Sequence, residues 1–577
     1  MIMRRYIYAL TALTAAALSV RVSVAQDLDP TVEVSRAYEG KLMEVHKPVL
    51  KMAVPDSVLR FDLDFDYSVF ESPYRGSYEF NPYAMTMRPT TAPRRQKCFY
   101  LRAGAGYALH PTLDLIWSPR SSKAFDMDVY AMHRSYIGEY RSLDTRLQPT
   151  GEFWNGNDLR SKAGADFHFD WRKARLDFGA GYYGLHRKDL SASSGYNALD
   201  LHARVRSKSS WPEHFLYDFS MKYRLGGDRM QSDAAVNVLR EHAFNFDMRL
   251  APSSRGVHNV YFDVALELDA YSGFLETVIG EFAFVPHYSF RYGIMDLDLG
   301  VRLAKLMRGD GGVTMYKTRE QFVYPDVTMR FDVVRNVLNM YLRAGGGNRI
   351  NTYSSLLGDN HHLNMTFGRQ HPLLDTTVER LSLILGFEGR ISSRFSYNLR
   401  GGYVNYKNDV LAALAPVGNE TEDASGGPAI LPAVGYAAYQ KGFISLDWRL
   451  KTERVSFEGG LEYVDAWGDA FGIDEASGLF RPASLTGDVS FEYNFKRRIF
   501  AGIDCSFSTA REAFVTGFSD ACRLPGYADL GLGLEYAAGS RFSVWLRGGN
   551  LLNMNIQRNP LYAERGINFT AGICLSF

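Results

Sequence analysis

The sequence predicts an all-β fold, a transmembrane antiparallel β-barrel of about 22 strands that follows a short N-terminal segment. Three observations predict this fold: an export signal without a helical membrane anchor, a period-two alternation of apolar and polar residues from Cys98 onward, and connections that alternate between short and long. The composition agrees, because 14% of the residues are aromatic and a formal net charge of +1 provides no basic field for nucleic acid. A mean hydropathy of −0.21 does not exclude membrane insertion, since lipid-facing and lumen-facing residues of a barrel average out.

The N-terminus has the pattern of a secretory signal peptide. Arg4 and Arg5 precede the apolar run Tyr6–Val20, and Ser23–Ala25 supplies the small residues of a cleavage site. The apolar run is too short to span a membrane, and no other run approaches the ~20 apolar residues that a spanning helix needs. We therefore expect residues 1–25 to be a signal peptide and any membrane span to be a β-strand. A buried N-terminal helix is the alternative interpretation.

Residues 26–97 differ from the rest of the chain. They contain short mixed segments and prolines at 30, 48, 55, 73, 82, 89 and 93. A segment of this length is too short to be comfortably stable as an ordinary globular domain. We therefore expect 26–97 to be a periplasmic or lumen-inserted segment that depends on the barrel or on a partner.

Residues 98–577 are expected to form the barrel. The clearest strand is Asp158–Trp171, in which an apolar set alternates with a charged set. The apolar set is Leu159, Ala163, Ala165, Phe167, Phe169 and Trp171, and the charged set is Arg160, Lys162, Asp166, His168 and Asp170. We expect the charges to face an aqueous lumen and the apolar side chains to face lipid, because a soluble β-sandwich would bury apolar residues between its two sheets.

The connections between strands sort by length. Short ones, such as 172–173, 335–336 and 392–394, alternate with long ones, which are 137–157, 226–240, 307–319, 349–376, 409–434, 465–483 and 511–526. Outer-membrane barrels have short periplasmic turns and long extracellular loops. The sequence therefore predicts a Gram-negative type outer-membrane location with both termini periplasmic.

The last run, Ile567–Phe577, is expected to close the barrel against the first strand, which begins after Cys98. Because these strands would be antiparallel neighbours, we predict that Cys98 and Cys574 lie close together. A disulfide between them and two unbonded buried thiols are both open interpretations. Cys505 and Cys522 are a second candidate pair, which would tie a long loop to its strand.

Three segments of the C-terminal half resemble the barrel of TonB-dependent receptors. They are Glu379–Asp409, Tyr527–Tyr536 with Asp529 and Leu530, and Val544–Tyr562, which contains Asn550-Leu551-Leu552-Asn553 and is followed by Gly566 and the terminal Phe577. The resemblance implies an outer-membrane receptor or transporter that takes up or binds a small nutrient. It covers about a third of the chain.

The N-terminal part departs from the family pattern, because no plug motif is recognisable in the 72 residues of 26–97. Thr31–Val34 (Thr31, Val32, Glu33, Val34) resembles a TonB box, and such a strand can add to a sheet edge of a periplasmic energy-transducing or accessory partner. An ordinary extended tail is the alternative. A barrel of this size has a wide lumen, so we expect 26–97 to enter it through the acidic run Asp62, Asp64 and Asp66, or loops 349–376 and 409–434 to fold inward.

Sites for chemistry are sparse. His361 and His362, with Asp359 and His371, are the densest potential metal ligands. Adjacent histidines rarely converge on one ion without supporting ligands, so we interpret them as part of a solvated polar loop. We assign no catalytic, cofactor-binding or metal site and expect no enzyme. The expected partners are outer-membrane lipid, a periplasmic protein and an unknown small ligand, without nucleic acid. The alternative function is a plugless structural or assembly barrel that docks a periplasmic or surface protein.

Overall fold

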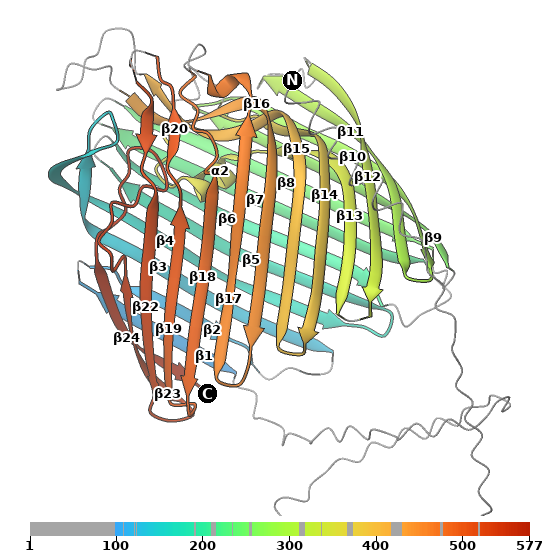
Figure 1. The fold of residues 1–577 in the computed structure, drawn as a ribbon, viewed down its shortest axis with the longest axis horizontal. Coiled ribbons are helices and arrows are strands. Elements are labelled where there is room, and N and C mark those ends of the chain that lie inside the picture. Colours follow the sequence, from blue (N-terminus) through green and yellow to red (C-terminus); the bar gives the residue numbers. More distant parts are fainter. Residues whose placement is uncertain are drawn as a thin grey trace, which may run out of the picture. The chain divides into compact units, whose positions relative to one another are not determined.

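The part of the chain that the structure describes forms one closed antiparallel β-barrel (Figure 1). This computed structural model describes residues 98–577 except 108, 120–121, 123, 190–191, 209–214, 233–234, 253–256, 311–317, 336, 366–372, 417–429, 473–476, 517 and 519. Twenty-two strands form one sheet, and the last strand pairs with the first. The predicted fold class, closure and strand number are confirmed. The signal peptide, the segment 26–97 and Thr31–Val34 lie outside the described residues.

The strands that the structure describes are β1 (Phe99–Gly106), β2 (Thr112–Trp117), β3 (Phe125–Leu143), β4 (Pro149–Asp170), β5 (Ala174–Lys188), β6 (Ala192–Ser207), β7 (Leu216–Ser232), β8 (Val236–Ala251), β9 (His258–Gly273), β10 (Thr277–Tyr292), β11 (Met295–Asp310), β12 (Thr318–Val334), β13 (Leu338–Ile350), β14 (Thr376–Ser392), β15 (Phe395–Pro416), β16 (Ile430–Lys451), β17 (Val455–Trp467), β18 (Leu485–Phe495), β19 (Ile499–Ser508), β22 (Tyr527–Ala537), β23 (Phe542–Gly549) and β24 (Asn568–Ser576). Strands β20 (Arg511–Ala513) and β21 (Cys522–Leu524) form a separate small sheet. The helices among the described residues are α2 (Tyr353–Asp359) and the 3₁₀ helix η2 (Asp469–Phe471). No helix in the described ranges has the length and apolar character needed to cross a membrane.

The two faces of the barrel wall differ as predicted. On β6 and β7, Leu199 and Leu225 are 45% and 43% exposed and belong to the outward apolar set. The residues that alternate with the apolar set face inward and form ion pairs between strands, including Arg249 Nε to Asp263 Oδ1 at 2.6 Å and Arg302 Nη2 to Glu281 Oε1 at 2.7 Å. Lipid on one side and water on the other explain this alternation.

Several predicted long loops are wrong, because their residues continue the strands. β4, β15 and β16 are each 22 residues long, about twice the ~9–11 residues that a strand needs to span a bilayer. Most of 137–157 and 226–240 is therefore paired strand. Beyond the membrane both faces of a strand can meet water or other protein, so pairing continues without the period-two pattern that identifies a spanning strand.

The seam between β1 and β24 is tightly packed. Gly104 and Gly572 are register partners, and a Cβ at Gly572 would lie 2.1 Å from the Ala103 carbonyl oxygen and 2.6 Å from Cζ2 of Trp545. The Phe577 amide donates to the Phe99 carbonyl at 2.9 Å. The C-terminal strand therefore closes the barrel through glycines that allow the indole of Trp545 to cover the junction.

The seam register separates the two cysteines that were predicted to be close. Cys574 is opposite Arg102 and is a free thiol, whereas Cys98 precedes Arg102 by four residues, roughly 13 Å along a strand. The shear of the barrel, and not the alignment of the chain ends, sets this register. The second candidate pair is not bonded either, because Cys505 and Cys522 are free thiols.

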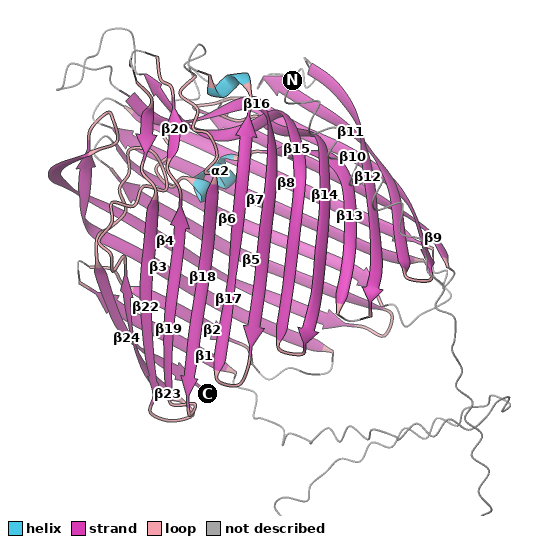
Figure 2. Ribbon diagram, viewed as in Figure 1, coloured by secondary structure: helices cyan, strands magenta, loops and turns pink. Residues whose placement is uncertain are grey.

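The end of the barrel that carries the long hairpins contains a small apolar core of its own. Leu147 from the β3–β4 connection, Leu414 from β15 and Leu524 from β21 are at most 2% exposed and pack together with Phe480. β20 lies at this end in Figure 2. The hairpins are therefore tied together beyond the wall and do not project separately.

Candidate functional site

The described residues of the connection between β13 and β14 fold into the barrel, and we call residues 351–365 and 373–375 the α2 segment. It contains helix α2, whose N-cap residue Thr352 accepts a hydrogen bond from the Ser355 amide at 3.1 Å. Figures 1 and 2 show α2 within the barrel, below the ends of the long hairpins. Inward folding of loop 349–376 was one of the two predicted ways to occlude the lumen, and the described residues of this loop do fold inward.

The apolar side chains of the α2 segment dock on the inner wall. Leu356, Leu357, Leu363 and Met365 are at most 2% exposed. They belong to one cluster with side chains from the inner faces of β5 to β10, namely Leu185, Tyr196, Met230, Leu239, Tyr271 and Ile279. Each fully buried side chain of this kind contributes about 1.5–3 kcal/mol. The segment is thus held against one side of the wall.

Asp228 of β7 is the first polar anchor of the α2 segment. Its carboxylate accepts from Ser194 Oγ at 2.6 Å, from Arg187 Nη2 at 3.0 Å and from the Tyr353 hydroxyl. Arg187 also donates to the Leu363 carbonyl at 3.0 Å. Burial raises the pKa of Tyr353 well above its ordinary value, so its hydroxyl remains a donor to Asp228.

Glu241 of β8 is the second anchor, at the start of the helix. Its Oε1 accepts from Ser354 Oγ at 3.1 Å and from the Tyr271 hydroxyl at 3.1 Å, and its Oε2 accepts from the Tyr196 hydroxyl at 2.6 Å. The Tyr353 amide in turn donates to the Tyr271 hydroxyl at 3.1 Å. A buried carboxylate with this many donors fixes position, because moving the segment would leave the charge unpaired.

A second inward segment, residues 550–567, connects β23 to β24, and we call it the terminal segment. Asn550 and Asn553 have φ values of 45° and 50°, which asparagine tolerates better than most residues. The Asn550 side chain accepts from the Met554 amide at 3.0 Å and donates to the Met554 and Arg565 carbonyls at 2.9 and 3.2 Å. The Asn550–Asn553 motif therefore shapes the turn into this segment.

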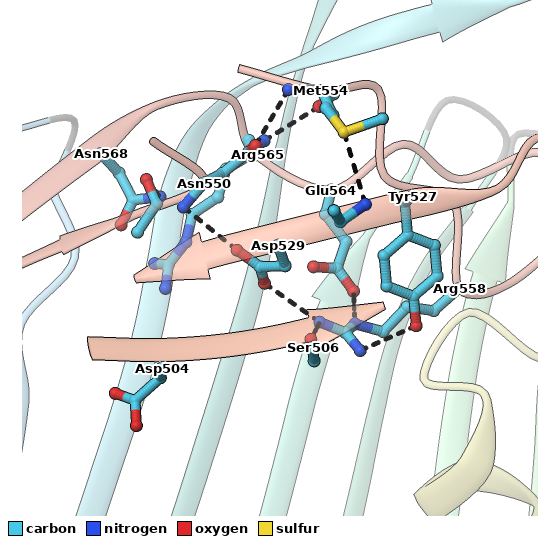
Figure 3. Close-up of polar contacts among 12 residues, drawn as sticks. Asp504, Ser506, Tyr527, Asp529, Asn550, Met554, Arg558, Glu564, Arg565 and Asn568 are labelled. Carbon is cyan, nitrogen blue, oxygen red and sulfur yellow. Dashed lines mark hydrogen bonds and ion pairs between the residues drawn. The ribbon is translucent and has the colours of Figure 1, made fainter. Parts of the chain in front are cut away.

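Arg558 ties the terminal segment to the barrel wall (Figure 3). Its Nη2 lies 3.1 Å from Asp529 Oδ2 on β22, its Nε lies 2.7 Å from Glu564 Oε1, and its Nη1 donates to the Tyr527 hydroxyl at 3.1 Å. Burial raises the pKa of Glu564, and Arg558 opposes that shift. Asp529 also accepts from the Asn550 amide at 3.2 Å, so residues of the family-like segments form one network.

The α2 segment and the terminal segment meet in the lumen. The rings of His362 and Tyr562 stack with centroids 4.0 Å apart, and the Tyr562 hydroxyl donates to Asp189 Oδ2 at 2.9 Å. Asn559 Nδ2 donates to the Asp359 carbonyl at 3.3 Å. Together the two segments link the β5–β10 wall to the β22 wall.

The adjacent histidines do not converge on one point. His361 Nδ1 lies 3.1 Å from Asp158 Oδ2, whereas His362 stacks on Tyr562. Burial lowers the pKa of His362 to about 4, against the opposing charges of Asp158 and Asp189. His371 lies outside the described residues, and within the described part no three potential ligands are placed to hold a metal ion.

Polar cavities remain along the wall away from the docked α2 segment. Three cavities of about 1000, 560 and 730 Å³ lie along the inner faces of β13–β19 and the neighbouring strands. Asp488 of β18 lines all three. The first also reaches Arg390 and Arg449, beside the short turns, and the third reaches Phe480 at the opposite end. The inner wall of this side is therefore accessible along much of its length.

The sequence did not identify the anchors of the α2 segment. Arg187, Asp228 and Glu241 have the same alternating positions as many other lumen-facing charges. A signal was present in the loop itself, because Leu356, Leu357 and Leu363 are unexpected in a fully solvated extracellular loop. Their presence favoured inward folding over exposure.

No family model and no curated protein sequence matches the chain. Solved structures do. The ferric-catecholate import receptor Fiu of E. coli K12 has a TM-score of 0.61 and 10% identity, covering 84% of this chain and 82% of its own. The FrpB iron transporter of Neisseria meningitidis has a TM-score of 0.61 and 10% identity, covering 83% and 81%. The siderophore receptor PiuA of Acinetobacter baumannii has a TM-score of 0.59 and 10% identity, covering 84% and 82%. The barrel has the fold of TonB-dependent outer-membrane receptors.

Proposed function

We propose that this protein is an outer-membrane receptor or transporter that takes up or binds a small nutrient. The observation that carries the proposal is the division of the lumen. The α2 segment is docked against the β5–β10 wall, while polar cavities line the β13–β19 wall. A barrel that served only as a scaffold would not need polar cavities along its inner wall beside a segment that narrows the lumen.

The fold likeness to Fiu, FrpB and PiuA supports the same class of function. An energy-transducing periplasmic protein of the TonB type is the proposed partner, and Thr31–Val34 is its proposed docking strand, added to a sheet edge of the partner. In this arrangement both chain termini are periplasmic and the long hairpins are extracellular.

Growth on single nutrients tests the proposal. A deletion strain is complemented with the full chain or with a chain lacking Thr31–Val34, and growth is measured at limiting concentrations of each nutrient. We expect at least one nutrient on which only the full chain restores growth. Normal growth of the deletion strain on every nutrient would instead favour the assembly barrel that docks a periplasmic or surface protein.

A further inference from the structure

Arg511 of β20 occupies an unusual electrostatic position. It lines the cavity of about 730 Å³ together with Tyr527 and Arg558. Its Nη2 donates to the Arg558 carbonyl at 2.6 Å. Within the described ranges no carboxylate forms an ion pair with Arg511, whereas Arg558 beside it is paired with both Asp529 and Glu564.

The surroundings of Arg511 disfavour its charge. Burial lowers the pKa of its guanidinium, and the only group that opposes this shift is Tyr527. Arg511 is partly buried, and a cation withdrawn from water without a counter-charge is costly to a fold. An anion that entered the cavity would supply the missing charge through charge-assisted, bidentate hydrogen bonds.

Tyr527 provides a second donor in the same place. Its hydroxyl oxygen accepts from Arg558 Nη1 at 3.1 Å, so its own proton remains available for a ligand. The Arg558 guanidinium also lies 5.0 Å from the centroid of the Tyr527 ring, which fixes the ring in the orientation that Figure 3 shows. The phenol is thus held in position by a residue that is itself held by two carboxylates.

We propose that this cavity binds a small solute through one anionic group, a carboxylate or a phosphate, placed between the guanidinium of Arg511 and the hydroxyl of Tyr527. Asp447, Glu462 and Asp488 also line the cavity, and their charges disfavour a polyanion. The proposal concerns binding and does not depend on transport.

Binding of radiolabelled inorganic phosphate to the purified full chain tests the proposal, by equilibrium dialysis at ionic strength held constant with sodium chloride. We expect one saturable site in the wild type, at least a tenfold loss of affinity in Arg511→Gln, and a smaller loss in Arg511→Lys. Arg541→Gln is the matched control, since Arg541 lies in the β22–β23 turn, and it should bind as the wild type does.

The melting temperature without phosphate separates binding from a structural role. Because Arg511 is an uncompensated cation, the unliganded Arg511→Gln protein should melt no lower than the wild type. Equal phosphate affinity in the wild type and Arg511→Gln, or no saturable binding in either, would overturn the proposal. A lower melting temperature with unchanged affinity would make Arg511 a structural residue and would overturn it as well.

Discussion

Replacing Leu357 with aspartate should release the α2 segment from the wall and widen the lumen. Leu357 is 0% exposed and packs in the cluster that joins the segment to β5–β10. Removing a buried leucine side chain costs about 2–5 kcal/mol, and an unpaired buried carboxylate adds several kcal/mol. A total of about 5 kcal/mol shifts the ratio of docked to undocked segment by more than a thousandfold.

Single-channel conductance in planar lipid bilayers measures the result. We expect Leu357→Asp to show open events of several-fold larger conductance than the wild type. Ser355→Asp is the matched control, because it introduces the same charge at an exposed position of the same helix. The barrel strands pair independently of the segment, and retention of heat-modifiable gel mobility would show that the variant is folded. A folded Leu357→Asp protein with wild-type conductance would refute the inference that the α2 segment constricts the lumen.

Three further outcomes follow from the contacts of the two inward segments and the seam. Because the pKa of His362 is lowered from 6.5 to about 4, the docked state binds fewer protons than the released state; docking is fully stable above about pH 6.5 and loses up to about 3 kcal/mol as the pH falls toward 4. The protection factors of amides in the α2 segment, which correct for the intrinsic exchange rate at each pH, should therefore fall more between pH 7 and 4.5 in the wild type than in His362→Phe. An equal fall in both proteins would contradict this assignment. Arg558→Ala should weaken the attachment of the terminal segment to the wall by about 1–2 kcal/mol, because the ion pairs of Arg558 are partly exposed. Limited proteolysis of this segment should be faster in Arg558→Ala but unchanged in the control Arg541→Ala. Equal proteolysis rates in the two variants would contradict the role of Arg558 as an anchor. Gly572→Val should prevent closure of the barrel and abolish its heat-modifiable gel mobility. The control Gly539→Val should assemble normally, because a Cβ at Gly539 would meet nothing within 4 Å. Normal assembly of both variants would contradict the tight packing at the seam.

The barrel could be predicted from the sequence because lipid and water impose a period of two on every spanning strand. Outside the membrane that constraint disappears, and the continuation of β15 to Pro416 and of β16 from Ile430 has no comparable pattern. The predicted loops were too long for this reason. The register between β1 and β24 could not be predicted from the sequence either, because it depends on the tilt of all the strands together.

The docking of the α2 segment depends on contacts between residues far apart in the chain. Tyr353 is 125 residues from Asp228, its hydrogen-bond acceptor. No spacing between neighbouring residues in the sequence indicates such a pair, and each partner alone resembles an ordinary lumen-facing residue. By contrast, the Asn550–Asn553 motif was visible in the sequence, since its role is local: it forms the turn that positions Arg558.

Depletion of a complex growth medium tests the proposed uptake function most directly. Wild-type cells, deletion cells and cells that express the chain without Thr31–Val34 are incubated in the same medium, and small solutes are quantified over time by mass spectrometry. The account predicts that at least one small solute is depleted faster by wild-type cells than by the other two strains. Identical depletion of every detected solute by all three strains would contradict it.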